Sequence, residues 1–283
     1  MKRLIALLLC LLTLSGFALS AYADGVADAS QMTTVEEVVE PGMTPVYASD
    51  LAEGEYPVAF KCSSSMFRID GALLKVHDGH MEVTLLMGSK SFLYVYPGSA
   101  EEAASTTEDA WTAPVVLENG AMTFTIPVEA LDAAVPCAAY SKNKELWYDR
   151  SLLFRADSLP VSAFREGFFT TAESLGLADG QYMASVTLAG GSGRASVQSP
   201  APLTVENGVC TAVIGWGSKN YDYMKVEGEK YLPIPNEDNA AFRIPVLYFD
   251  RPMPVIADTV AMSEPHEISY TLCFDSASLE AAP

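Results

Sequence analysis

The chain has 283 residues, of which 49% are hydrophobic and 19% are charged, and its formal net charge at pH 7 is −19. Because single domains usually comprise about 100–200 residues, this length and apolar content predict more than one core. A surface with this much negative charge repels phosphate backbones, which argues against nucleic acid as a partner. The ordinary explanation of the charge is that it keeps the protein soluble.

Residues 1–23 have the pattern of a secretory signal peptide. A basic start precedes an apolar run over residues 4–14, and a small-x-small cleavage site follows at residues 21–23. The apolar run is too short to span a bilayer, and no later stretch reaches about 18 apolar residues. We therefore expect an exported protein, secreted or at the cell surface, with no membrane span in the mature chain and with a flexible leader over residues 24–50.

Two segments farther along the chain match each other. Residues 88–98 and 217–228 both begin Gly-Ser-Lys, and both place aromatic residues four and six positions after the glycine. Such a matched pair indicates a duplicated module. We expect the first module over residues 51–159, a linker over residues 160–176, and the second module over residues 177–281.

Each module contains short runs of alternating polarity that are separated by turn residues. Asp78-Gly79 and Asn207-Gly208 lie between such runs, and these dipeptides favour two-residue hairpins, in which both positions need a positive φ. Seven or eight short strands in about 105 residues, without a helical period, are typical of an immunoglobulin-like sandwich. The predicted fold class is all-β, with two tandem immunoglobulin-like β-sandwich domains after the signal peptide.

Four cysteines follow the signal peptide: Cys62, Cys137, Cys210 and Cys273. Export permits disulfides, and one bridge within each module is the simplest of the three possible connectivities. Buried free thiols are the alternative, because the cysteines of the two modules do not occupy equivalent positions: Cys210 aligns with Met81 and Cys273 aligns with Leu153. No CxxC spacing supports a thiolate metal site.

The chain has three histidines. His77 and His80 flank the Asp78-Gly79 turn, and we expect a hairpin tip to keep their rings on different sides, which indicates a solvated turn and not a metal site. His266 precedes the last strand, where the side-chain period of two places it on the same face as Tyr270. A strand-end histidine beside Glu267 is the alternative interpretation of His266.

The second module resembles the NEAT (near-iron transporter) domain family, the haem-binding β-sandwiches of Gram-positive surface proteins. The resemblance rests on Ser218 to Val226, which is similar to the family's lip, on the strand Phe242 to Pro245, and on a closing motif from His266 to Phe274. In that family a short helical lip covers one face of a haem. The first tyrosine of the closing strand binds iron, and the second hydrogen-bonds to the first.

The resemblance implies a site in which His266 stands at the position of the iron ligand and Tyr270 orients it from the second position. The thioethers of Met224 and Met262 are alternative ligands for the iron, and packing under the lip is the other interpretation of these two residues. The implied cofactor is haem, and the implied cofactor-binding residues are His266, Tyr270, Ser218, Tyr221, Tyr223, Met224 and Met262. Tyr221, Tyr223, Trp216 and Tyr270 are expected to form a flat aromatic slot.

The first module departs from the family motif, because Leu146 and Arg150 align with His266 and Tyr270. We expect it to be a degenerate NEAT-like sandwich that binds no haem.

The predicted function is haem capture or relay through the second module, with a haem donor or a receiving transporter protein at the cell surface as partner. The alternative is a non-catalytic adhesion or scaffold module without haem. An enzyme is not expected, since the chain has no GxSxG, no HExxH and no phosphate-binding glycine loop.

Overall fold

The computed structural model describes residues 25–28, 30, 32, 38–236, 239–261 and 266–282. The described residues form antiparallel β-sheets with one short α-helix and several single turns of 3-10 helix, which confirms the predicted all-β class. No helix among them is long and apolar enough to cross a membrane. The predicted signal peptide, residues 1–23, and the candidate ligand Met262 lie outside the described residues.

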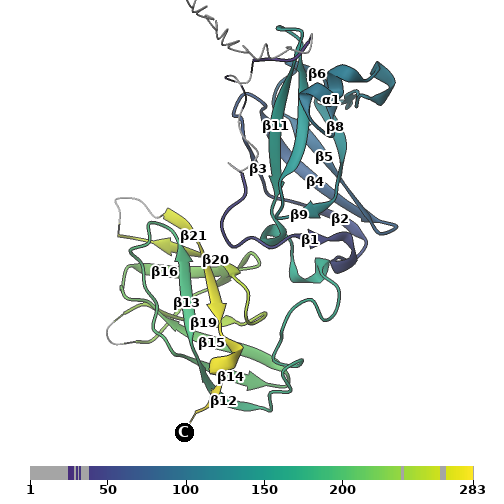
Figure 1. Ribbon diagram of the computed structural model, residues 1–283. Coiled ribbons are helices and arrows are strands. Elements are labelled where there is room, and N and C mark those ends of the chain that lie inside the picture. Colours follow the sequence, from purple (N-terminus) through teal and green to yellow (C-terminus); the bar gives the residue numbers. More distant parts are fainter. Residues whose placement is uncertain are drawn as a thin grey trace, which may run out of the picture.

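We call residues 46–159 the N-terminal half; it contains two main sheets (Figure 1). The five-stranded sheet has the order β2 (Gly54–Pro57), β4 (Ile69–His77), β5 (His80–Met87), β8 (Met122–Val128) and β7 (Val115–Val116). The four-stranded sheet has the order β3 (Phe60–Cys62), β11 (Leu146–Phe154), β10 (Val135–Ser141) and β6 (Phe92–Tyr96). A separate pair joins β1 (Val46–Tyr47) to β9 (Ala130–Leu131).

We call residues 177–282 the C-terminal half; it also contains two sheets. The six-stranded sheet has the order β18 (Pro233–Ile234), β19 (Ala241–Pro245), β15 (Val209–Gly215), β14 (Ala201–Glu206), β12 (Gly180–Ala184) and β22 (Glu280–Ala281). The five-stranded sheet has the order β13 (Val186–Gly190), β21 (His266–Phe274), β20 (Met253–Thr259), β16 (Tyr221–Val226) and β17 (Glu229–Tyr231).

The two halves repeat one strand order. The run β2-β4-β5-β8 corresponds to β12-β14-β15-β19, and the run β3-β11-β10-β6 corresponds to β13-β21-β20-β16. The closing strands β11 and β21 have nine residues each, so position 146 corresponds to position 266 and position 150 to position 270. The similarity of the two sequence segments thus reappears as a repeated topology.

The two predicted hairpin turns have the predicted backbone. Asp78 and Gly79 have φ values of 49° and 74°, and Asn207 and Gly208 have values of 52° and 77°. Positive φ at both central positions gives the turn a twist that matches the right-handed twist of its strands. Each turn therefore fixes the register of the hairpin that it closes.

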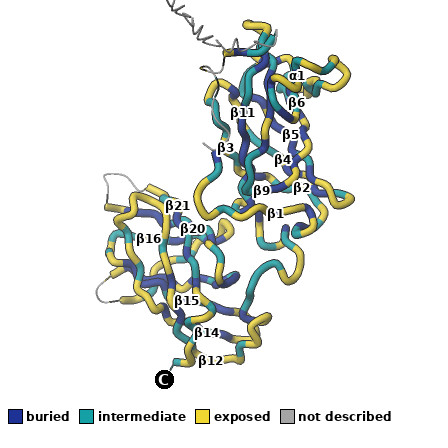
Figure 2. Tube along the Cα trace, viewed as in Figure 1, coloured by how far each residue is buried: buried dark blue, intermediate teal, exposed yellow. Residues whose placement is uncertain are grey.

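Buried residues lie along the strands of both halves (Figure 2), and their side chains form two large hydrophobic clusters, one in each half. In the N-terminal half, Leu85 of one sheet and Leu152 of the other belong to the same cluster and are fully buried. In the C-terminal half, Ile244 and Leu272 do the same. At about 1.5–3 kcal/mol for each fully buried aliphatic side chain, these clusters supply the main favourable term in folding.

The segments outside the sheets also make contacts. The predicted leader includes Val38, which is fully buried, and Glu40, whose carboxylate lies 3.3 Å from the guanidinium of Arg155. Within residues 160–176, the ring of Phe169 stacks on Tyr248 of the C-terminal half at 4.1 Å between centroids. Leader and linker therefore pack on the sheets at these positions.

The helical elements are short. The α-helix α1 (Ala100–Ser105) begins at Ser99, whose hydroxyl accepts from the backbone N–H of Glu102 at 3.2 Å, while Glu102 accepts in return from the N–H of Ser99 at 2.8 Å. This reciprocal capping box satisfies two otherwise unpaired donors. The 3-10 turns are η3 (Ala48–Asp50), η4 (Glu108–Ala110), η5 (Ala156–Ser158), η6 (Val161–Ala163) and η7 (Ser276–Ser278).

Candidate functional site

The candidate site lies where β16 pairs with β20, beside the start of β21. The register shifts inside β16, because Tyr221 is opposite Thr259 but Tyr223 is opposite Asp258. Asp222 is thus the extra residue of a β-bulge. Without the bulge, Tyr221 and Tyr223 would share one face of the strand. With it, they lie on opposite faces.

The inner face holds Tyr221, Trp216, Tyr270 and Met224. The Tyr221 and Trp216 rings are 4.0 Å apart between centroids, and the hydroxyls of Tyr221 and Tyr270 are 3.1 Å apart. The indole Nε1 of Trp216 donates to Sδ of Met224 at 3.4 Å. Met224 is fully buried, and Trp216 and Tyr270 are 2% and 4% exposed. The side chains pack against one another, and burial raises the pKa of Tyr221 well above its usual range.

The outer face holds a charged group around Tyr223. The Tyr223 hydroxyl donates to Glu267 at 2.7 Å, and the Lys225 ammonium donates to the same carboxylate oxygen at 2.5 Å. The ammonium of Lys230 lies 3.5 Å from the centroid of the Tyr223 ring. The hydrogen bond to Glu267 raises the pKa of Tyr223 to about 12, and the bonds from Lys225 and Tyr223 lower the pKa of Glu267. Tyr223 is thus separated from the other three residues of the predicted aromatic slot.

His266 is the first residue of β21 and is exposed. It lies opposite Thr259 on β20, and the strand period of two puts its side chain on the face that also carries Tyr270. The imidazole forms no hydrogen bond or ion pair with the part of the chain that the structure describes, whereas the Tyr270 hydroxyl is paired with Tyr221. The implied orienting contact from Tyr270 to His266 is therefore not formed in this arrangement.

The lip segment differs from the expected helix. Residues 217–220 form a bend, and the following residues form strand β16. The Ser218 hydroxyl accepts from the backbone N–H of Asn220 at 3.2 Å, and the Ser218 carbonyl accepts from the N–H of Ala240 at 3.1 Å. The expectation of a short helix here is wrong, because the Ser218 carbonyl accepts from a neighbouring segment and the Asn220 N–H donates to a side chain, so neither makes a helical backbone bond.

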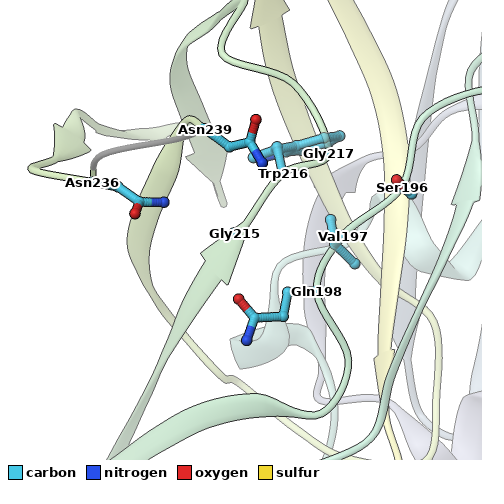
Figure 3. Close-up of a pocket in the computed structure, with 8 residues that line it drawn as sticks. All are labelled: Ser196, Val197, Gln198, Gly215, Trp216, Gly217, Asn236 and Asn239. Carbon is cyan, nitrogen blue, oxygen red and sulfur yellow. The ribbon is translucent and has the colours of Figure 1, made fainter.

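A polar recess lies directly beside this segment (Figure 3). Its volume is about 320 Å³, and its lining consists of Ser196, Val197, Gln198, Gly215, Trp216, Gly217, Asn236 and Asn239. The backbone N–H of Gln198 donates to Gly215 at 2.7 Å, and that of Gly217 donates to Ser196 at 2.8 Å. A Cβ at position 217 would lie 2.4 Å from the Ser196 hydroxyl, so a larger residue there would have to displace this hydroxyl.

Sequence reasoning missed this recess. The side chains that line it come from three separate segments, and each amide or hydroxyl residue alone is ordinary loop composition. The available signal was the Gly-Trp-Gly run at residues 215–217, since glycine on both sides of a large ring often marks a close approach of another backbone segment.

The expectation for His77 and His80 is wrong in one respect. These residues are direct cross-strand partners in the hairpin of β4 and β5, so both side chains lie on the outer face of the sheet. His77 lies 3.7 Å from Glu82 through Nε2 and 3.7 Å from Asp78 through Nδ1. Among the described residues, no group of three or more histidine, cysteine, aspartate or glutamate side chains is arranged to hold a metal ion.

The four cysteines within the described residues are free thiols. Strand β11 lies between the strands of Cys62 and Cys137, and at about 4.8 Å between neighbouring strands their Cα atoms are roughly 10 Å apart, beyond the reach of about 7 Å for a disulfide. Cys210 and Cys273 belong to different sheets, and Cys273 alternates with core residues and so points away from the core. A bridge within each module is therefore excluded.

The same positions carry different chemistry in the N-terminal half. Phe92 begins β6 as Tyr221 begins β16, and Arg150 stands at the position of Tyr270. On the outer face, Tyr94, Tyr140 and Trp147 form an aromatic group with Trp111, whose ring stacks on Tyr140 at 6.2 Å.

Comparison with models of known protein families gives no match. Comparison with curated proteins gives no match either.

Proposed function

We propose that this protein is an exported or cell-surface haem-binding protein, built from two immunoglobulin-like β-sandwiches of NEAT-like type, that captures or relays haem through residues 177–281. A haem donor or a receiving transporter at the cell surface is the proposed partner. The observation that carries the proposal is the exposed imidazole of His266, which has no partner among the described residues and lies on the same face as the aromatic cluster of Trp216, Tyr221 and Tyr270.

Of the described residues that the resemblance implies as possible iron ligands, only His266 offers a free donor atom. A neutral imidazole is a good ligand for haem iron, and haem would supply an iron centre with an open coordination position. Met224 does not serve, because its sulfur is buried and accepts from Trp216. Tyr221, which is partly exposed, would supply an aromatic wall, and Ser218, on the bend before β16, would supply a hydroxyl for a propionate.

A haemin titration of the mature chain, followed by absorbance, tests the proposal. We expect a saturable Soret change, and we expect His266→Ala to weaken haemin binding at least tenfold or to change the position of the band. The double variant His77→Ala, His80→Ala is the matched control, because it removes two exposed imidazoles far from the site. Absence of a saturable change in the unmodified protein would refute haem binding.

The polar recess favours a second candidate function, a non-catalytic surface interaction module. Its carboxamides, from Gln198, Asn236 and Asn239, are neutral donors and acceptors that suit a hydroxyl-rich glycan. Screening the mature chain against immobilised glycans tests this candidate. Binding that Gln198→Ala abolishes and His266→Ala leaves intact would favour the interaction module over the haem protein.

A further inference from the structure

Asp258 is a buried aspartate on the outer face of the five-stranded sheet of the C-terminal half, and it is 2% exposed. Its strand, β20, lies between β16 and β21, and Asp258 is directly opposite Tyr223 on one side and Glu267 on the other. Direct cross-strand partners carry their side chains on the same face. The Oδ2 atom of Asp258 is buried and has no hydrogen-bond partner among the described residues. A buried carboxylate oxygen without a donor is unfavourable, so a group that completes its bonding is expected.

The β-bulge brings a second carboxylate to the same place. Asp222 is the extra residue of β16, and Asp222 and Tyr223 together are opposite Asp258. The carboxyl groups of Asp222 and Asp258 are within hydrogen-bonding reach of each other. Two ionised carboxylates are acceptors only, so this contact is repulsive unless one of the two groups carries a proton.

The other charged groups on this face have their own partners. Glu267 accepts from Lys225 at 2.5 Å and from the Tyr223 hydroxyl at 2.7 Å. The ammonium of Lys230 lies over the Tyr223 ring, 3.5 Å from its centroid. Within the described part of the chain, Lys225 forms an ion pair with Glu267, and neither ammonium forms one with the two aspartates.

The formal charges on this face do not balance. Asp222, Asp258 and Glu267 contribute three negative charges when ionised, and Lys225 and Lys230 contribute two positive charges, which leaves one negative charge in excess. The residues outside the described part cannot supply the missing cation. Apart from the predicted signal peptide, they include no lysine, arginine or histidine. One proton would balance the group, and a divalent metal ion would overcompensate it.

The electrostatics of Asp258 agree with this count. Burial raises the pKa of Asp258, the contact with Asp222 and the charge of Glu267 raise it further, and the charge of Lys230 opposes them. Because the two aspartates interact directly, the raised pKa belongs to the pair and not to one residue. The folded chain therefore keeps a proton here to a higher pH than the unfolded chain does, in which an aspartate has a pKa of about 3.9.

We propose that Asp222 and Asp258 share one proton and so form a proton-linked latch on the β-bulge. The shared proton turns a repulsive contact into a hydrogen bond between the extra residue of β16 and the neighbouring strand β20. The bulge directs Tyr221 toward Tyr270 and Tyr223 toward the outer face, so the latch stabilises the packing of both faces. The latch is independent of the haem proposal, because neither aspartate is a candidate iron ligand and the effect is on folding.

The direction of the pH dependence follows from the raised pKa. The stabilisation is fully present at a pH below that of the unfolded aspartate, about 3.9, and is lost as pH rises through the raised pKa of the pair. Urea unfolding of the mature chain between pH 4 and pH 8, with the midpoint of the C-terminal half recorded, compares the parent with Asp258→Asn. The contributions of all other carboxylates are common to both proteins and cancel in the difference.

The amide of Asp258→Asn donates to Asp222 at every pH and imitates the protonated pair. The two midpoints should agree near pH 4. At pH 8 the variant should exceed the parent by roughly 0.5 M urea or more, the shift that one hydrogen bond to a charged group gives at a typical slope. Asp222→Asn should show the same trend, and the double variant should add little to either single variant. The control is Glu118→Gln, which removes an exposed carboxylate of the N-terminal half and should follow the parent at every pH.

Infrared difference spectra of the folded proteins, parent minus Asp222→Asn, give a second measurement that needs no unfolding. The carbonyl band of a protonated carboxyl should persist to a higher pH than that of an ordinary aspartate. The proposal is overturned if Asp258→Asn follows the parent at every pH. It is also overturned if calcium or magnesium chloride raises the midpoint of the parent saturably at pH 8 but not that of Asp258→Asn, because a metal ion would then take the place of the proton.

Discussion

The hydroxyl pair of Tyr221 and Tyr270 allows a quantitative test of the packed aromatic cluster. The two oxygens are 3.1 Å apart, and Tyr270 is 4% exposed while Tyr221 is partly exposed. A neutral hydrogen bond contributes about 1 kcal/mol net, and leaving one partner buried and unpaired costs about 1–3 kcal/mol. The cost of each single Tyr→Phe change therefore depends on how well the remaining hydroxyl reaches water.

This difference in exposure sets the expected magnitudes. Tyr221→Phe leaves the buried hydroxyl of Tyr270 without a partner and should destabilise the C-terminal half by about 2 kcal/mol. Tyr270→Phe leaves the more exposed hydroxyl of Tyr221 without a partner and should destabilise it by about 1 kcal/mol. The double variant removes both groups and should cost about 1 kcal/mol in total. The predicted coupling energy is thus about 2 kcal/mol.

Urea unfolding of the mature chain, followed by circular dichroism, measures these differences. A cost of about 2 kcal/mol corresponds to a midpoint shift of roughly 0.7–2 M at a typical slope of about 1–3 kcal/mol/M. If the double variant is destabilised by the sum of the single variants to within about 0.4 kcal/mol, the two hydroxyls do not interact and the packed cluster described here is incorrect.

Three further measurements test other features of the structure. All four cysteines of the mature chain should react with a thiol reagent in the denatured, unreduced protein. A disulfide between Cys62 and Cys137, seen as two unreactive cysteines, would contradict the strand order. The free energy of unfolding should fall as pH rises from about 10 to about 12. The reason is that the pKa of Tyr223 is raised to about 12 in the folded state, whereas that of an unfolded tyrosine is about 10. A urea midpoint that does not change over this pH range would be inconsistent with the hydrogen bond from Tyr223 to Glu267. Ser99→Ala should lower the free energy of unfolding of the N-terminal half by about 1 kcal/mol through the lost helix cap, and Ser99→Asp should largely restore it.

The sequence predicts most of the local structure correctly, since turns and alternation depend on neighbouring residues. The Asp78-Gly79 and Asn207-Gly208 hairpins follow from the φ values that these residues tolerate. The alignment of Arg150 with Tyr270 follows from the repeat and agrees with the equal lengths of β11 and β21. The approximate positions of the strands in both halves follow from the same signals.

The site is harder to predict, because it depends on cross-strand register. One extra residue, Asp222, sends Tyr221 into the core and Tyr223 to the outer face, and nothing in the composition of the lip marks the bulge. Likewise His77 and His80 share a face because they are direct partners across the hairpin. The order of strands separates Cys62 from Cys137 by a whole strand.

The sequence by itself determined the all-β class, the repeat and the hairpins, because these depend on backbone preferences and apolar periods of a few adjacent residues. Only the tertiary structure decided which side chains meet: the paired hydroxyls of Tyr221 and Tyr270, the recess beside Trp216 and the buried charge of Arg150. The physical reason is that burial and contact are properties of segments far apart in the chain, and a register shift of one residue moves a side chain from one face of a sheet to the other.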